Sequence, residues 1–212
     1  AHRPIVLQEF DIGQKRLVGK PIRLTYGFTE HGFTEGPHLY KHGEYYYLLT
    51  AEGGTGYGHG AAVGRSRNIE GPYEADPQGP ILTSALHEYS VRENPQMLKP
   101  ELYNPATVIQ KAGHASLVET QTGEWYAVHL SSRPILPQKR CILGRETSIQ
   151  KMAWTSDGWI RMEDGSNLAK DFVPEPKIAE TPFPPLPEYD DFDKEQLAIF
   201  YNSPRNPITP DW

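Results

Sequence analysis

The residue best suited to proton-transfer chemistry is Glu35, in the segment Phe33-Thr-Glu-Gly-Pro-His-Leu-Tyr40. A carboxyl group held in one place can donate a proton to a departing oxygen. Gly36 and Pro37 follow it directly and predict a tight backbone with a fixed φ just before a strand. The pattern fits a general acid, although a glutamate beside a turn is also common as solvated surface.

Arg145 is a second candidate, because its guanidinium keeps its charge and offers five donors in a fixed plane. That geometry suits the recognition of two neighbouring oxygens on one ligand. The alternative is an ion pair with Glu146 inside the same strand. Adjacent strand residues point to opposite faces, which weakens that alternative.

Two histidines are further candidates. His114 lies between small residues that leave room for a ligand, and a packed, hydrogen-bonded histidine is the alternative. His59 follows the Gly53-Gly54 loop and could line the same pocket. We interpret Trp125 and the run Tyr45–Tyr47 as packing aromatics rather than platforms for a ligand.

Composition excludes several classes of partner. The chain has 212 residues, of which 37% are hydrophobic and 23% charged, with a net charge of -6. Its mean hydropathy is -0.60 and its pI about 5.8, as in an ordinary soluble globular protein. No apolar run reaches the roughly 18 to 20 residues that cross a bilayer. The negative charge argues against nucleic acid, because nothing would neutralise its phosphates. We expect a neutral or small partner.

Cys141 is the single cysteine, which excludes an internal disulfide framework. It lies in the strand-like stretch 140–144, and we expect it to be a small buried hydrophobic residue. The first residues, Ala-His-Arg-Pro-Ile-Val-Leu, read as a strand already under way and carry no visible targeting signal. We therefore expect the parent chain to begin upstream, and we assign no compartment, secreted or cytoplasmic.

The elements that must position these residues are strands. Short runs rich in Tyr, Val, Ile, Leu and Trp alternate with Gly, Pro and Asn/Asp punctuation, and helical periodicity is nearly absent. Three stretches predict β-hairpins: 37–50 with a turn at 42–43, 115–130 with a turn at 121–123, and 150–162 with a turn at 156–158. The fold class is therefore all-β.

Two of these hairpins resemble each other. Each has a Gly-Glu-aromatic-Tyr step, at 43–46 and at 123–126, after an apolar strand of similar length. Similar hairpins at a long spacing indicate a repeat architecture, and β-propeller blades of four strands fit this material. A sandwich of short hairpins is the alternative.

The sequence predicts three regions. Residues 1–172 hold the hairpins and form the main domain. Residues 173–187 are rich in proline and predict a stiff, extended linker. Residues 188–212 begin a new segment, too short to bury a core of its own, which we interpret as the start of a truncated domain.

Five stretches together resemble the second half of the catalytic domain of family 43 β-xylosidases. They are Thr34–Tyr40, Tyr47–Thr55, Ile69–Glu74, Ala112–Val118 and Leu143–Lys151, in matching order and rough spacing over about residues 5 to 165. The tail Asp190–Asp193 resembles the opening of the β-sandwich domain that follows the propeller in longer members. The resemblance implies a five-bladed β-propeller, and at about 60 residues a blade this chain would hold about three.

The resemblance also implies roles for single residues. Glu35 matches the general acid of an inverting glycosidase, Arg145 the arginine that binds sugar hydroxyls, and Phe33 falls in the same substrate-binding segment. His114 matches a histidine at the propeller centre, close to the sugar and in some relatives associated with a metal, commonly calcium. We expect no required cofactor. Calcium held through water at His114 is the one candidate, because a lone imidazole suits a hard cation poorly.

Inversion requires two carboxyl groups, and the resemblance places the second one outside this chain. The family's base aspartate and the aspartate that raises the acid's pKa would both precede Ala1. Glu52 and Glu146 are the nearby carboxylates, and neither matches the base. We therefore expect an N-terminal half of the propeller as partner and an inactive fragment without it. We also expect Glu35 to lie buried at the pocket floor.

The expected reaction is release of xylose from the non-reducing end of xylo-oligosaccharides, with arabinosides as related substrates. A non-catalytic carbohydrate-binding propeller is the alternative, and it would not need an intact Glu35 motif. Nucleic acid and membrane are not expected partners, and the sequence leaves an oligomer open.

Overall fold

The computed structural model describes residues 3–90, 95–194, 196–201 and 203. It divides the chain into two compact units, 1–178 and 179–212. The strands of the described residues all lie in the first unit, with one 3-10 helix, η1 (Pro100–Leu102). The strands are β1 (Ile5–Asp11), β2 (Arg16–Thr25), β3 (Glu35–His42), β4 (Tyr45–Glu52), β5 (Gly60–Ser66), β6 (Glu74–Ala75), β7 (Leu82–Thr83), β8 (Gln110–Glu119), β9 (Trp125–Ser132), β10 (Glu146–Trp154) and β11 (Ile160–Met162).

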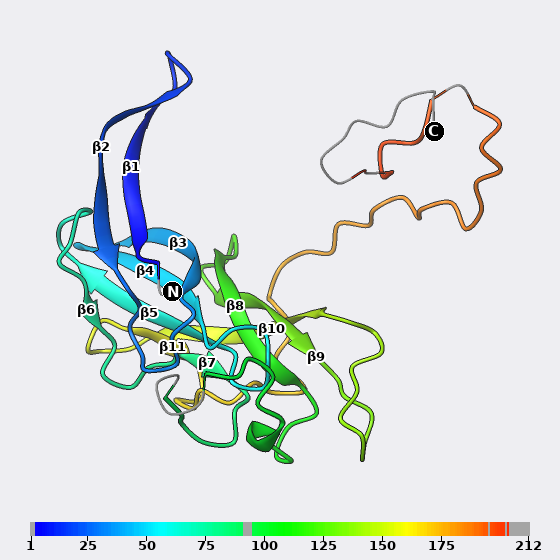
Figure 1. Cartoon of the computed structure of the whole chain (residues 1–212). Coiled ribbons are helices and arrows are strands. Elements are labelled where there is room, and N and C mark those ends of the chain that lie inside the picture. Colours follow the sequence, from blue (N-terminus) through cyan, green and yellow to red (C-terminus); the bar gives the residue numbers. More distant parts are fainter. Residues whose placement is uncertain (1–2, 91–94, 195, 202, 204–212) are drawn as a thin grey trace. The chain divides into compact units, whose positions relative to one another are not determined.

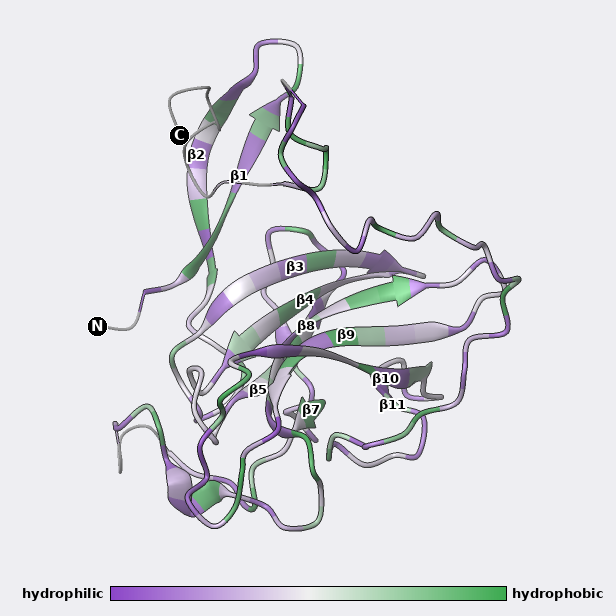
Figure 2. Ribbon diagram, turned by 90° about the vertical axis from the view of Figure 1, so that its right-hand side faces the viewer, coloured by the Kyte–Doolittle hydropathy of each residue, from purple (hydrophilic) through white to green (hydrophobic). Residues whose placement is uncertain are grey.

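Two larger sheets and one hairpin make up the first unit (Figure 1). One sheet has the order β3-β4-β5-β6, with β7 also paired to β5, and the other has the order β8-β9-β10-β11. Both are antiparallel meanders in which successive strands are neighbours. The β1–β2 hairpin forms a separate two-stranded sheet and carries alternating hydrophilic and hydrophobic bands (Figure 2). The all-β prediction is confirmed.

The predicted hairpins are confirmed as β3–β4, β8–β9 and β10–β11. The two that resemble each other in sequence occupy the same place in their sheets, as the edge strand and its neighbour. Their turn glycines, Gly43 and Gly123, both have positive φ, at 55° and 78°. That conformation strains residues with a Cβ, which explains glycine at both turns.

The hydrophobic core lies between the two larger sheets. Small residues, among them Ala61, Ala112 and Ala127, are buried at this junction and let the strands approach closely. Tyr47 is 2% exposed and its hydroxyl donates to the carbonyl of Gly158 at 2.6 Å. Trp125 packs edge-on against Trp154, with ring centroids 5.4 Å apart. The interpretation of Tyr47 and Trp125 as packing aromatics is confirmed.

The strand-like reading of residues 140–144 is wrong. Arg140 forms an isolated bridge with Ile135, and a turn follows, with Ile142 and Leu143 exposed. Cys141 is free and only partly buried, contrary to expectation. Among the described residues no strand continues the pairing beyond the Ile135–Arg140 bridge, so the apolar residues of the segment face solvent.

The start of the proline-rich stretch docks on the first unit, which extends to Ile178. The Tyr126 hydroxyl donates to the carbonyl of Pro174 at 3.1 Å, and the backbone N–H of Lys177 donates to a Glu124 carboxylate oxygen at 2.7 Å. Within the described part of the chain, no helix is long and apolar enough to span a membrane.

Candidate active site

The strand that carries Glu35 is bulged where the candidate acid sits. Glu35 pairs with Ala51 and His38 with Leu49, so three steps on β3 oppose two on β4. Gly36 lies inside this bulge at φ 55°. β3 is an edge strand, and both edges and bulges tolerate a proline such as the one that follows Gly36. The predicted tight backbone is a β-bulge that begins at Glu35, within the strand and not before it.

The first strand of the other sheet, β8, is bulged twice. Gln110 pairs with Ser132, Gly113 with Leu130 and Ser116 with Val128, so each interval gains one residue. The two bulges contain Lys111 at φ 56° and His114 at φ 52°. Residues other than glycine seldom adopt such angles, and they persist only where surrounding structure holds them. Bulges of this kind re-aim side chains and occur frequently beside active sites.

The two bulged strands meet through Gly36 and His114. A Cβ built on Gly36 would lie 2.3 Å from His114 Nε2, so only glycine lets the imidazole come this close. Further along the same strands, Ser116 Oγ lies 3.2 Å from His38 Nε2. The backbone N–H of Leu117 donates to the Tyr40 hydroxyl at 2.8 Å. The sheet junction therefore brings the backbone of Glu35-Gly36 against His114.

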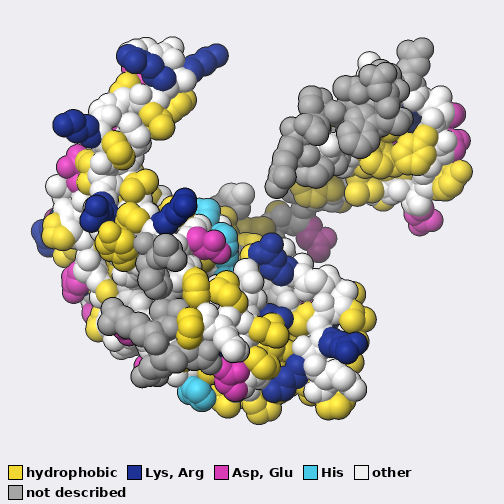
Figure 3. Space-filling view, in the orientation of Figure 1, with side chains coloured by type: hydrophobic (Ala, Val, Ile, Leu, Met, Phe, Trp, Pro, Cys, Tyr) yellow, Lys and Arg dark blue, Asp and Glu magenta, His cyan; other side chains and the backbone are white. Residues whose placement is uncertain are grey.

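Glu35 is exposed on this face, and its carboxylate has no hydrogen bond or ion pair to the described residues. The expectation of burial at a pocket floor is not met in this chain. The reason is that β3 is the edge strand of its sheet and nothing in the described residues covers it from that side. Figure 3 shows histidine, acidic and basic side chains close together on the concave side of the first unit.

The two other nearby carboxylates are already engaged. Glu52 is 1% exposed and accepts hydrogen bonds from the backbone N–H groups of Phe28 (2.7 Å) and Thr29 (3.0 Å) and from the hydroxyls of Thr29 and Thr50. Burial raises the pKa of Glu52, with the hydrogen bonds opposing it. Glu52 therefore anchors residues 28–29 and is not free to activate water.

Glu146 binds Arg133 and not Arg145. Arg133 Nη2 lies 2.6 Å from Glu146 Oε1, and the Arg133 backbone N–H donates to Oε2 at 3.0 Å. Arg133 holds the pKa of Glu146 below its usual range. The suggested Arg145–Glu146 ion pair is therefore wrong. Arg145 is exposed and makes no hydrogen bond or ion pair with the residues that the structure describes.

His59 lies beneath the surface, at 2% exposure. Its Nδ1 is 3.0 Å from the carbonyl oxygen of Lys111, and its ring centroid is 6.4 Å from that of His114. Burial lowers the pKa of His59 to about 4, and the charges of His114 and Arg145 act in the same direction. His59 and His114 are therefore neighbours across the two sheets.

Phe33 and Met97, a residue that sequence reasoning missed, both lie close to Gly54. Phe33 is partly buried at φ 51°. A Cβ built on Gly54 would lie 3.8 Å from the Phe33 ring and 2.4 Å from the Met97 methyl group. Met97 comes from the long connection between β7 and β8 and is 43% exposed. No sequence motif marks it, because only folding places that connection beside Gly54.

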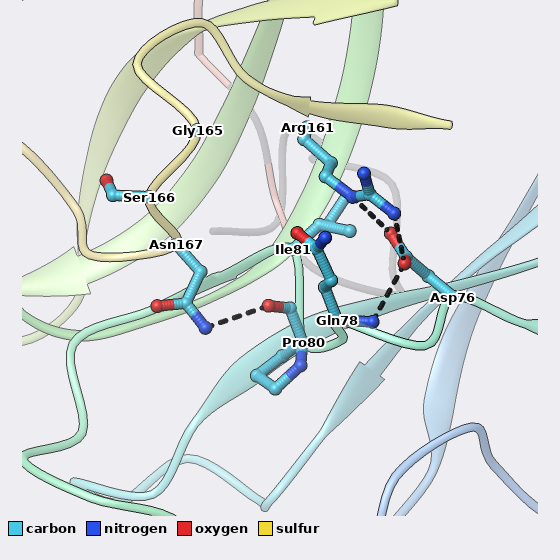
Figure 4. Close-up of a pocket in the computed structure, with 8 residues that line it drawn as sticks. All are labelled: Asp76, Gln78, Pro80, Ile81, Arg161, Gly165, Ser166 and Asn167. Carbon is cyan, nitrogen blue, oxygen red and sulfur yellow. Dashed lines mark hydrogen bonds and ion pairs between the residues drawn. The ribbon is translucent and has the colours of Figure 1, made fainter. Parts of the chain in front are cut away.

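A separate pocket of about 210 Å³ lies away from the predicted residues, between the loops that follow β6 and β11. Arg161 spans it, with Nε 3.0 Å and Nη2 2.7 Å from the two Asp76 carboxylate oxygens (Figure 4). Asn167 donates from its side-chain amide to the carbonyl of Pro80 at 3.0 Å. The charged groups satisfy each other, so we interpret this pocket as structural.

Metal binding at His114 stays a prediction. Within residues 3–90, 95–194, 196–201 and 203, no three His, Cys, Asp or Glu side chains gather closely enough to hold an ion. A single imidazole does not meet the six to eight oxygen ligands that calcium takes. The chain's own described residues therefore do not fit a calcium site.

Comparison with known proteins gives consistent results. The profile of the family described as glycosyl hydrolases family 43 matches residues 1–160. A β-xylosidase of Bacillus subtilis (strain 168) is 44% identical over 214 residues, which cover 97% of this chain and 36% of that protein. Xylosidase/arabinosidase 43B of Humicola insolens is 47% identical over 161 residues, covering 76% of this chain and 27% of that protein.

A solved structure shows the same likeness. The xylan β-1,4-xylosidase of Bacillus halodurans C-125 superposes with a TM-score of 0.79 and 49% identity, over 99% of this chain and 36% of that one. The chain thus spans about a third of the length of the relatives that it matches.

Proposed function

We propose, because the chain belongs to family 43 of the glycosyl hydrolases, that it supplies the acid half of an inverting exo-glycosidase site. Glu35 is the general acid, and the products are xylose units released from the non-reducing end of xylo-oligosaccharides. Arabinosides are related substrates, since the Humicola relative carries both activities in its name. Glycosidase chemistry follows from the family, whereas the acid role and inversion are part of the proposal.

The observation that carries the proposal is the junction of the bulged strands β3 and β8. At this junction Glu35 is exposed, and no described residue engages its carboxylate. The backbone of the next residue, Gly36, packs against the His114 ring. A general acid must come within hydrogen-bond reach of the scissile oxygen, and an exposed carboxyl that no described residue engages can do so. The second candidate carboxylates, Glu52 and Glu146, are both engaged, so they do not compete for this role. A carbohydrate-binding module would need neither the free acid nor its bulge.

The roles of the neighbours follow from their exposure. Arg145 is exposed and unengaged by the described residues, so its donors are available for sugar hydroxyls. His114 is partly buried and borders the acid from the other sheet. Phe33 contributes an apolar ring two residues before Glu35. We assign Phe33, His114 and Arg145 to contact with the sugar unit that the reaction releases.

The site is completed by parts outside this chain. We propose that the two meanders are consecutive blades of a five-bladed propeller and that β1–β2 belongs to a third. The base aspartate would come from the remaining blades, and the fragment alone would be inactive. The proline-rich stretch would lead to a β-sandwich domain. Calcium, if the complete enzyme binds it near His114, would need ligands beyond the described residues.

The test uses an exchange enzyme, defined as the Bacillus halodurans xylosidase with its matched region replaced by this chain. Glu35→Gln is assayed on methyl β-xyloside, a poor leaving group, and on nitrophenyl β-xyloside, a good one. We expect kcat/KM to fall by about 10²–10⁴ on the methyl substrate, the usual contribution of a general acid. On the nitrophenyl substrate the loss should be below about tenfold, because that phenolate leaves without protonation.

Arg145→Ala is the matched comparison, because Arg145 would act on the sugar and not on the leaving group. It should lower kcat/KM alike on both substrates. Nuclear magnetic resonance of the first-formed xylose anomer tests inversion. Equal losses on the two substrates for Glu35→Gln would contradict the acid role, and retained configuration would contradict inversion.

A further inference from the structure

His59 is buried beside the site, and the proposed reaction gives it no task. It lies just before β5, in the first sheet, whereas its contacts lie on β8 in the second. The His59 side chain is only 2% exposed, so it is too deeply buried to contact a bound sugar directly. What the ring does contact is the doubly bulged segment from Lys111 to His114.

The first contact fixes the state of the imidazole. Nδ1 of His59 lies 3.0 Å from the Lys111 carbonyl oxygen, which can only accept. Nδ1 must therefore carry the proton, and Nε2 of the neutral ring is left with a lone pair. Nε2 is buried, and none of the described residues hydrogen-bonds to it. The ring therefore acts on its described surroundings through Nδ1 and through its faces.

The second contact is with the backbone between the two bulges. A Cβ built on Gly113 would lie 2.6 Å from two ring carbons of His59, so the ring rests directly on the Gly113 backbone. The residues on either side of this contact, Lys111 and His114, both have positive φ, at 56° and 52°. Such strained conformations need support from their surroundings. His59 supplies it from the opposite sheet.

We propose that His59 is a positioning residue that holds the bulged segment of β8 so that His114 stands against Gly36, beside Glu35. The hydrogen bond from Nδ1 to the Lys111 carbonyl holds the backbone of the first bulge in place. The ring packs on the Gly113 backbone and fixes its position. His59 acts through His114 and does not touch the substrate. This inference rests on the proposed function, because it assigns His59 its effect on that same site.

The test compares three substitutions of His59 in the exchange enzyme, with nitrophenyl β-xyloside as substrate. His59→Asn places an amide N–H near the position of Nδ1, whereas His59→Gln reaches the position of Nε2, and His59→Ala keeps neither. We expect His59→Asn to stay within about threefold of the unsubstituted enzyme. His59→Gln and His59→Ala should lose about tenfold in kcat/KM, equivalent to about 1.4 kcal/mol.

A double-mutant cycle separates positioning from general support. If His59 acts through His114, His59→Ala should cost less than about twofold when His114 is already alanine. His129→Ala is the matched control, because His129 is also 2% exposed and places Nδ1 3.0 Å from a backbone carbonyl, that of Leu130. It should lower the melting temperature and leave kcat/KM at 25 °C within about twofold.

The inference is overturned if His59→Asn is as damaging as His59→Ala, or if the effects of His59→Ala and His114→Ala add. A folded exchange enzyme without xylosidase activity would refute the proposed function instead. In that case two-bond ¹H–¹⁵N spectra of the 212-residue chain still decide the inference. A proton on Nδ1 of His59 at pH 7 supports it, and a proton on Nε2 overturns it.

Discussion

Substituting alanine at Gly36 tests the contact on which the site depends. Gly36 has φ 55°, and its built Cβ would meet three atoms of the His114 ring at 2.3 to 2.9 Å. The left-handed conformation costs a residue with a Cβ roughly 1–2 kcal/mol. Forcing an extra methyl group into a packed contact typically adds about 1–3 kcal/mol. Gly36→Ala should therefore destabilise the chain by about 2–5 kcal/mol.

Gly43 provides a matched control within the same hairpin. Its φ is also 55°, but a Cβ built on it would meet nothing within 4 Å. Gly43→Ala should therefore cost only the backbone contribution, roughly 1–2 kcal/mol. Both substitutions restrict the unfolded chain equally, so their difference isolates the clash with His114. Guanidinium unfolding followed by tryptophan fluorescence measures both values.

A double substitution identifies the partner in the clash. His114→Ala removes the ring, so the added cost of Gly36→Ala in that background should fall to the value of Gly43→Ala. In the exchange enzyme, Gly36→Ala should also lower kcat/KM, because the displaced ring no longer borders Glu35. Equal destabilisation by Gly36→Ala and Gly43→Ala, or an unchanged cost without His114, would refute the reasoning.

Two further predictions concern the stability of the sheets. Asp76→Ala leaves the Arg161 guanidinium buried with Asp157 as its remaining carboxylate, so we expect it to destabilise the chain by about 3–5 kcal/mol. Asp164→Ala removes only an exposed pair with Lys170 and should cost less than about 1 kcal/mol. Urea unfolding measures both free energies, and equal values would contradict this prediction. Burial lowers the pKa of His129, so this histidine binds a proton more weakly in the folded chain than in the unfolded chain. Stability should therefore fall as the pH decreases below about 6.5. His129→Gln should make the melting temperature less dependent on pH between pH 7 and 5, as measured by thermal melts.

Local patterns predicted the strands well. The turn residues at 42–43, 121–123 and 156–158 lie between strands that pair as expected, because turn chemistry and alternation act over a few residues. The similar hairpins also predicted equivalent places, and each forms the edge strand and its neighbour in its own sheet. Where the local pattern lacked a neighbouring strand, as around Cys141, the same reasoning failed.

By itself the sequence determined the all-β class, the hairpins and a glutamate in a constrained segment. Only the tertiary structure decided what surrounds that glutamate. The register shifts in β3 and β8 aim Gly36 and His114 at each other although 78 residues separate them, and no local pattern encodes such a meeting. The same holds for Glu146, whose partner proved to be Arg133 across the strand pair. Pairing register and sheet packing select these contacts, because they depend on which distant strands share a core.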